Sequence, residues 1–167
     1  MPMLNRTTWM GPSLTASHPT IYQTYMLGIA FFLCSSLGCA GQAEAQSQSA
    51  QAALGEANEL FYQQKYAQAA EKALAAAELD TTSAGVQQAA AELVYLSGES
   101  QKSLKLFDRA IQLAPEAAPR NWQRGIALAS CGKFKQGAKQ FETHHRVNPD
   151  DVENSAWYFL CIAKTSN

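Results

Sequence analysis

The residues beyond the N-terminal third that are best suited to metal binding or acid–base chemistry are two adjacent histidines, His144 and His145. Neighbouring residues of a regular helix point about 100° apart, so these two rings cannot face one ion together. No acidic or cysteine residue stands at a spacing that would complete a metal site. We expect His144 to pack between helices and His145 to face solvent, and the sequence predicts neither a metal site nor a cofactor.

Nucleophilic chemistry is supported no better. Cys131 and Cys161 are the cysteines that follow residue 50, and they do not form the Cys-x-x-Cys pair that redox and zinc sites use. The chain contains neither a Gly-x-Ser-x-Gly turn nor a glycine-rich phosphate loop. We therefore predict no catalytic residues and a protein that is not an enzyme.

The elements that would position any site repeat along the chain. Residues 107–116 and 141–150 lie 34 positions apart (141 minus 107) and share Phe, an acidic residue and Pro at equivalent points. The same step relates further sets of similar residues: Leu79, Leu113 and Val147; Leu60, Val94 and Leu128; and Ala57, Ala91 and Gly125. A period of this length is typical of a helix-turn-helix unit that buries its apolar face by stacking on copies of itself.

Glycine and proline mark where the helices of each unit end. Gly98 and Gly132 fall between the two helices of a unit, where a residue that tolerates positive φ is favoured. Pro115 and Pro149 close their units, because proline cannot continue a helix. We place the units at about residues 50–83, 84–117 and 118–151, followed by a single helix over residues 152–164.

The third unit resembles the tetratricopeptide repeat (TPR) family. The matching residues are Gly125, Gly132, Phe134, Gly137, Phe141 and Pro149. The resemblance covers about residues 50–167 and implies an all-α fold, a right-handed α-solenoid of about three TPR units plus a C-terminal helix. It implies a fold without naming a ligand.

Composition agrees with this expectation. With 167 residues, of which 47% are hydrophobic, the chain has material for one modest domain. Good helix formers dominate after residue 50, and no alternating strand pattern appears. The net charge of −1 favours no nucleic-acid partner. The first unit is acidic and the third basic, either because the charges orient a partner or because they are solvated helix faces.

Residues 1–45 are predicted to be an N-terminal leader or signal segment of an exported bacterial protein. Met26–Leu33 is an uncharged apolar run with the length of a signal-peptide core, too short for a comfortable membrane span. Ala43-Glu44-Ala45 offers a cleavage site, and Ser36-Leu37-Gly38-Cys39 approximates a lipoprotein box in which Cys39 would be lipidated. Signal cleavage, lipidation and an uncleaved anchor are three alternatives, and each places the repeats outside the cytoplasm, periplasmic or secreted.

A polar and alanine-rich segment follows the leader. Residues 46–52 are predicted to be a flexible, low-complexity tether that leads into the TPR domain at residues 53–167. Within that domain we expect Cys131 and Cys161 to be free, since their places in the units put them about one helical turn out of step.

The resemblance also implies where a partner would bind. TPR solenoids act through a concave groove lined by the first helix of each unit. Mapping the family geometry onto this chain predicts a partner-binding groove of Asn58, Tyr62, Gln88, Glu92, Tyr95, Trp122 and Ile126. Such an aromatic surface with a few polar groups suits a peptide or protein partner. The alternative is that several of these rings pack between helices.

One class of partner is disfavoured. Some family members hold a partner's C-terminal carboxylate with Lys, Asn and Arg side chains at five positions. Those positions here are occupied by Leu54, Asn58, Ala89, Pro119 and Gln123. Because only Asn58 matches, we do not expect binding of chaperone C-terminal tails.

The C-terminal helix carries six consecutive apolar residues, from Trp157 to Ile162. A helix with such a run is apolar on more than one side, so one side should remain uncovered by the third unit. We predict a surface for self-association that includes Trp157 and Phe159. Two functions therefore remain: a non-enzymatic scaffold that binds a peptide or protein partner, and a structural TPR protein that associates with itself without a specific peptide ligand.

Overall fold

The computed structural model describes the backbone of residues 20–166 and the side chains of residues 41–166. The chain divides into two units, residues 1–41 and residues 42–167. The side chain of Cys39 and most of the predicted leader lie outside the described residues. In the part of the chain that is described, none of the helices has both the length and the apolar character needed to cross a membrane.

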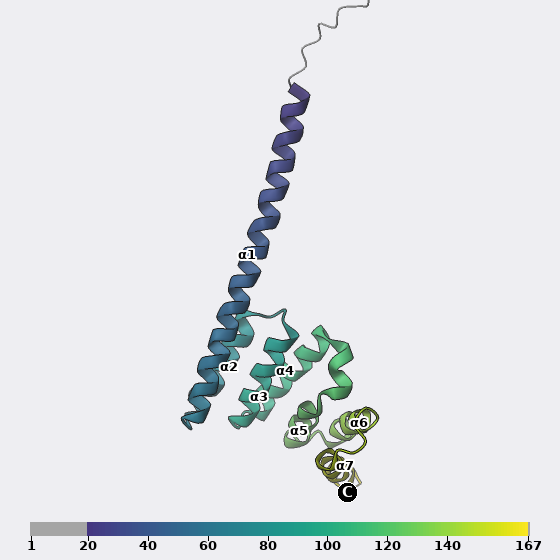
Figure 1. Cartoon of the computed structure of the whole chain (residues 1–167). Helices are drawn as coiled ribbons and strands as arrows, with labels where there is room; N and C mark the ends of the chain where they lie inside the picture. Colours follow the sequence, from purple (N-terminus) through teal and green to yellow (C-terminus); the bar gives the residue numbers. More distant parts are fainter. Residues whose placement is uncertain (1–19, 167) are drawn as a thin grey trace, which may run out of the picture. The chain divides into compact units, whose positions relative to one another are not determined.

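Helices account for all the regular structure of residues 20–166, and no strand occurs among them (Figure 1). The elements in chain order are α1 (Thr20–Tyr62), α2 (Tyr66–Leu79), α3 (Ala84–Leu96), α4 (Ser100–Leu113), the 3₁₀ helix η1 (Pro115–Arg120), α5 (Trp122–Ser130), α6 (Phe134–His145) and α7 (Val152–Thr165). The end of α1 with α2, α3 with α4, and α5 with α6 form three helix-turn-helix units, and α7 follows as a single helix. The all-α fold expected from the sequence is therefore confirmed.

The structure differs from the expected tether at residues 46–52, because these residues are part of α1. Ala50 is fully buried, and Ala53, Leu54 and Ala57 continue the same face of the helix at spacings of three and four residues. This face packs on alanines of α2 and on the apolar side of α3. The small side chains that resembled a low-complexity linker are instead the contact surface of the first unit.

The turn inside each unit has the same backbone conformation. Gln64, Gly98 and Gly132 lie at successive steps of 34 residues, and all three have positive φ, at 61°, 92° and 72°. Glycine adopts this conformation without steric cost, whereas a side chain such as that of Gln64 is crowded in it. Positive φ was expected at the two glycines, and the first unit reaches the same turn with a less suitable residue.

The packing between the two helices of a unit depends on paired residues. Ala57 shares a core cluster with Ala73, and Ala91 shares one with Phe107. The equivalent pair in the third unit is Gly125 and Phe141. A Cβ atom built on Gly125 would lie 2.7 Å from both Cε1 and Cζ of the Phe141 ring, so this helix contact requires glycine.

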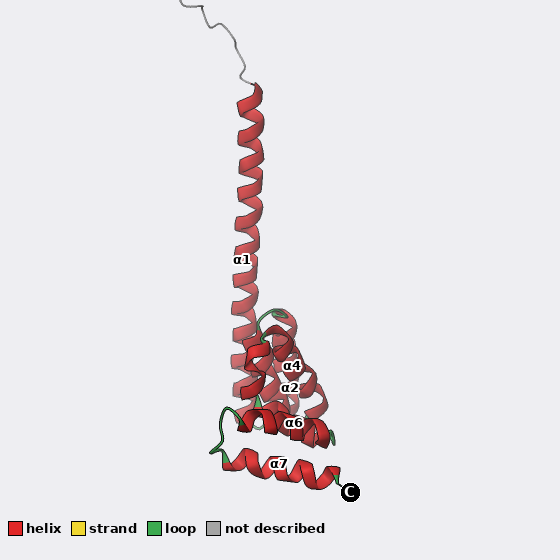
Figure 2. Ribbon diagram, turned by 90° about the vertical axis from the view of Figure 1, so that its right-hand side faces the viewer, coloured by secondary structure: helices red, strands yellow, loops and turns green. Residues whose placement is uncertain are grey.

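Helix α7 continues the solenoid by packing beside α6, as Figure 2 shows with the two helices next to one another. Asp151 precedes α7 and accepts a hydrogen bond from the backbone N–H of Asn154, which is an N-cap arrangement. Cys161 is buried against the third unit, and Cys131 is half-buried. Both cysteines are free, and burial raises the pKa of each thiol.

Candidate functional site

A cavity of about 260 Å³ opens where α3, α4 and α5 meet. Its lining residues are Glu92, Tyr95, Leu96, Phe107, Trp122, Gln123 and Ile126. Helix α3 supplies the first three, α4 supplies Phe107, and α5 supplies the rest. Four of the seven residues predicted for the groove, Glu92, Tyr95, Trp122 and Ile126, thus line one cavity.

A chain of side-chain hydrogen bonds joins α3 to the start of α5 beside this cavity. Asn121 Nδ2 donates to Gln88 Oε1 at 2.6 Å, and Gln88 Nε2 donates to Glu92 Oε1 at 2.8 Å. Gln123 Nε2 donates to the same Glu92 oxygen at 3.1 Å. The oxygen of Asn121 caps α5 by accepting from the backbone N–H of Arg124. Glu92 is therefore fixed from both helices before any partner arrives.

Gln88, the fifth predicted groove residue, lines a neighbouring cavity of about 350 Å³. Trp122 and Gln123 line both cavities, so the two hollows share a wall. Arg120 lines this second cavity but not the first. The five predicted residues of the second and third units consequently lie around one continuous stretch of surface.

The rings of this surface both pack and line the cavity. Tyr95 and Trp122 are half-buried and contact the core cluster around Phe141. The Tyr95 hydroxyl lies 3.1 Å from Ser130 Oγ, which ties the end of α3 to the end of α5. The two alternatives left open by the sequence, a binding role and a packing role, are compatible because both rings line the cavity and also contact the core cluster.

The two predicted groove residues of the first unit are placed differently. Asn58 is exposed, and Tyr62 is 76% exposed with its ring packed edge-on against Phe61 at 6.1 Å between ring centres. Neither residue lines the two cavities of the second and third units. Of the residues predicted for the groove, those of the second and third units therefore line these cavities and those of the first unit do not.

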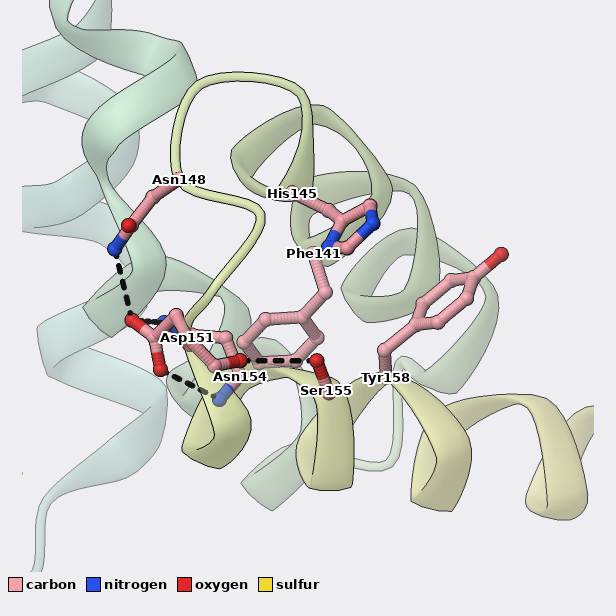
Figure 3. Close-up of a pocket in the computed structure, with 7 residues that line it drawn as sticks. All are labelled: Phe141, His145, Asn148, Asp151, Asn154, Ser155 and Tyr158. Carbon is pink, nitrogen blue, oxygen red and sulfur yellow. Dashed lines mark hydrogen bonds between the residues drawn. The ribbon is translucent and has the colours of Figure 1, made fainter.

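Figure 3 shows a smaller cavity, of about 110 Å³, between the end of α6 and the start of α7. Asp151 organises it by accepting hydrogen bonds from the amides of Asn148 and Asn154 and from the Asn154 backbone. The Asn154 backbone N–H is the main cause that lowers the pKa of the Asp151 carboxyl. The Asn154 amide and the His144 ring act in the same direction, against a partial burial that raises it.

The two histidines take the positions that the sequence indicated. His144 is buried, its Nδ1 lies 3.1 Å from the carbonyl oxygen of Pro119, and its Nε2 lies 3.5 Å from Asp151 Oδ2. This ring therefore joins α6 to η1 through the Pro119 carbonyl, whereas its Nε2 lies beside the Asp151 carboxylate without a hydrogen bond. His145 is exposed at the edge of the small cavity in Figure 3. Among residues with described side chains, no group of three or more possible metal ligands comes together.

The two residues predicted for association, Trp157 and Phe159, lie on different sides of α7. Trp157 is half-buried and packs against the cluster around Phe141 and Cys161. Phe159 is 73% exposed, and Tyr158, Leu160 and Ile162 are exposed beside it. The expected second apolar side of this helix is thus present, with Phe159 at its centre and Trp157 on the packed side.

Sequence reasoning missed three residues of the main cavity as groove residues. Leu96 follows Glu92 by one helical turn on α3, so its spacing could have indicated it. Gln123 directly follows Trp122, and adjacent helical residues point in different directions, so no spacing from Trp122 indicates it. Phe107 lies on the second helix of its unit and also lines the cavity. A mapping restricted to first helices could not include it.

Family models and curated proteins give no match to this chain. Solved structures do match it. The second TPR domain of the human RPAP3 protein, in complex with the HSP70 peptide SGPTIEEVD, has 20% identity and a TM-score of 0.59 over 71% of this chain and 97% of that one. The Sgt2 TPR domain from Aspergillus fumigatus has 15% identity and a TM-score of 0.58 over 71% of this chain and 80% of that one. The MamA protein has 19% identity and a TM-score of 0.60 over 74% of this chain and 67% of that one. At these identities the similarity establishes the fold, an α-solenoid of TPR type.

Proposed function

We propose that this chain is a non-enzymatic interaction scaffold that binds a peptide segment of a protein partner across α3 and α5. The observation that carries the proposal is the 260 Å³ cavity, in which aromatic walls and one fixed carboxylate converge. Drug-sized ligands usually occupy larger pockets, roughly 300–1,000 Å³, so a cavity of this size suits a single side chain of a larger partner. The shared wall with the neighbouring cavity gives the rest of a peptide a surface to follow.

The chaperone tails bound by some proteins of this fold are an unsuitable model for the partner. The HSP70 peptide in the human complex ends in EEVD, which is strongly acidic. In this chain Leu54, Ala89 and Pro119 occupy positions where a carboxylate-holding groove needs a cation or an amide. The cavity itself presents Glu92, which would repel such a tail.

Capture of a partner by the full chain tests the proposal. The protein is immobilised, incubated with an extract of cell-envelope proteins, and the retained proteins are compared between the wild type and Trp122→Ala. We expect a partner whose retention falls by at least tenfold with Trp122→Ala, because a central aromatic side chain commonly dominates such interfaces. Far-UV circular dichroism verifies that the fold is intact.

A matched control is offered by Tyr62, which is a similar ring outside the cavity. Tyr62→Ala should leave retention unchanged. If Trp122→Ala and Tyr62→Ala retain the same proteins in the same amounts with the fold intact, the scaffold proposal is wrong for this groove.

A second candidate function is self-association through the exposed face of α7, which the 73% exposure of Phe159 favours. Light scattering over a concentration series tests it, with an increase of the average mass expected for the wild type and a monomer for Phe159→Ser. Trp157→Ser is less informative, because Trp157 also packs on the third unit. A wild type that stays monomeric at high concentration contradicts this function.

We also propose that the scaffold acts outside the cytoplasm, supported by the apolar run of residues 26–33 and the small residues after it. Expression of the full chain in a bacterial host, followed by fractionation and mass measurement of the mature protein, tests this. A mass beginning after Ala45 supports cleavage there, and a lipid adduct on Cys39 supports an anchor. An intact chain confined to the cytoplasm would refute export.

A further inference from the structure

We infer that the cavity between α3 and α5 selects a cationic side chain, Lys or Arg, of the bound peptide. This inference rests on the proposed function and specifies the chemistry of the partner. It depends on which oxygen of Glu92 is already used, on the absence of basic residues from the lining, and on the aromatic walls.

The Glu92 carboxylate has one oxygen that is not engaged. Both amide donors, Gln88 Nε2 and Gln123 Nε2, bind Oε1. Among residues with described side chains, Oε2 of Glu92 accepts no hydrogen bond. Oε2 is also not one of the buried polar atoms that lack a hydrogen-bond partner, so it is in contact with solvent. Oε2 is therefore an accessible acceptor on a side chain whose position is fixed.

The charge of Glu92 is also not neutralised. Its two hydrogen-bond donors are neutral amides, and none of the ion pairs of residues 41–166 involves Glu92. No basic residue lines the cavity, although the third unit is rich in them. Several of those bases line a different cavity with Asp108, among them Arg124, Lys133 and Lys139. An uncompensated carboxylate in a mostly apolar hollow attracts a cation more strongly than it would in open water.

The walls of the cavity suit the rest of a Lys or Arg side chain. Tyr95 and Trp122 present aromatic rings, and Leu96 and Ile126 add aliphatic surface. A long basic side chain can lay its methylene groups along such walls while its charged end reaches an acceptor. Aromatic faces attract cations, and this attraction adds to that of the carboxylate. A neutral aliphatic side chain would fill the space but leave the charge of Glu92 without a counterion.

A library of random twelve-residue peptides displayed on phage, selected on the immobilised full chain, tests the inference. We expect the enriched peptides to share one Lys or Arg next to an apolar residue. One enriched peptide is then synthesised in two forms, with Lys and with the neutral, similarly shaped norleucine at that position. The wild type should bind the Lys form at least about tenfold more tightly.

The matched variant is Glu92→Gln, which removes the charge while keeping a side chain of the same shape beside Gln88 and Gln123. We expect it to bind the Lys and norleucine forms equally, and we expect the preference of the wild type to shrink as salt is raised. Glu71→Gln is the control, because Glu71 is exposed on α2, lines neither cavity and undergoes the same change of charge, so it should leave the preference in place.

The outcomes separate this inference from the proposed function. Enriched peptides that need Trp122 but carry no shared cation, or that bind Glu92→Gln with an unchanged preference, would overturn the cation inference and leave the scaffold standing. Peptides whose binding is unaffected by Trp122→Ala would overturn the groove itself, and so would a selection that enriches nothing. A preference for Lys that disappears in Glu92→Gln but not in the control variant supports both the scaffold proposal and the cation inference.

Discussion

Replacing Gly125 by alanine should destabilise the protein, although alanine is the better helix former. Gly125 lies inside α5, where alanine gains about 1 kcal/mol over glycine. The new Cβ atom would lie 2.7 Å from two atoms of the Phe141 ring and 3.1 Å from a third. Phe141 is 1% exposed, so its ring has little space to move aside. Overpacking of this kind costs about 1–3 kcal/mol, so the net change should lie between about 0 and 2 kcal/mol, destabilising.

Gly55 provides the matched control for this prediction. It lies inside α1, and a Cβ atom built on it meets no other atom within 4 Å. Gly55→Ala should therefore show the helix gain alone, about 1 kcal/mol of added stability. The difference between Gly55→Ala and Gly125→Ala isolates the steric cost at the Phe141 ring, which we expect to be about 1–3 kcal/mol.

Urea unfolding of the full chain, followed by circular dichroism at 222 nm, measures both free energies, and the double variant Gly125→Ala with Phe141→Leu tests the cause. Leucine lacks the ring atoms that the new Cβ would meet, so the two changes should be less harmful together than the sum of their separate effects. Equal stabilisation by Gly125→Ala and Gly55→Ala would refute the reasoning, because it would mean that the Phe141 ring yields at no cost.

Three further predictions concern the turns, the start of α7 and the thiols. Gln64→Gly should stabilise the chain by up to about 1 kcal/mol in urea unfolding, and Gly132→Ala should destabilise it by a similar amount, because both residues have positive φ. A destabilising Gln64→Gly or a stabilising Gly132→Ala would contradict this reasoning. The folded-state pKa of Asp151 is lowered, so its stabilising effect is present above the unfolded pKa of about 3.9 and is lost as the pH falls through the folded value. The stability advantage of the wild type over Asp151→Asn should accordingly shrink as the pH falls from 5 to 3. An advantage that stays constant would mean that the charge of Asp151 does not stabilise the start of α7. Iodoacetamide at pH 8 should modify half-buried Cys131 before buried Cys161, as followed by peptide mass spectrometry, and the reverse order would show that α7 detaches readily.

The sequence was informative wherever one residue type serves the same purpose in each unit. Phe107 and Phe141 revealed the period, and Gly98 and Gly132 revealed the turns, because few residues fill those volumes or adopt that φ. The first unit has Gln64 at the position of these two glycines, so its turn could not be recognised from the residue type. Local chemistry therefore predicted the fold except where packing overrides local preference.

The candidate site was predictable only in part, because its details depend on side-chain partners from different helices. Glu92, Tyr95, Trp122 and Ile126 follow from their helical positions. The choice of Oε1 by both amides of the network depends on rotamers that no spacing specifies. The prediction for residues 46–52 was wrong for a related reason. Their composition suits a linker, and their helix depends on the core formed with α2 and α3, in which Ala50 is buried.

The paired residues at the centre of each unit limit how this solenoid can be recombined. The first unit pairs Ala57 with Ala73, and the third pairs Gly125 with the larger Phe141. Either member of a pair transplanted alone would therefore bring a void or a collision with it. A whole unit that is moved keeps its own pair, so its internal packing is preserved. Its contact with the preceding unit is not, because Asn121 needs Gln88 of that unit as a hydrogen-bond partner. A block exchanged without loss of these contacts would therefore have to run from α3 to α6, because that stretch holds both members of the second and third pairs together with Gln88 and Asn121.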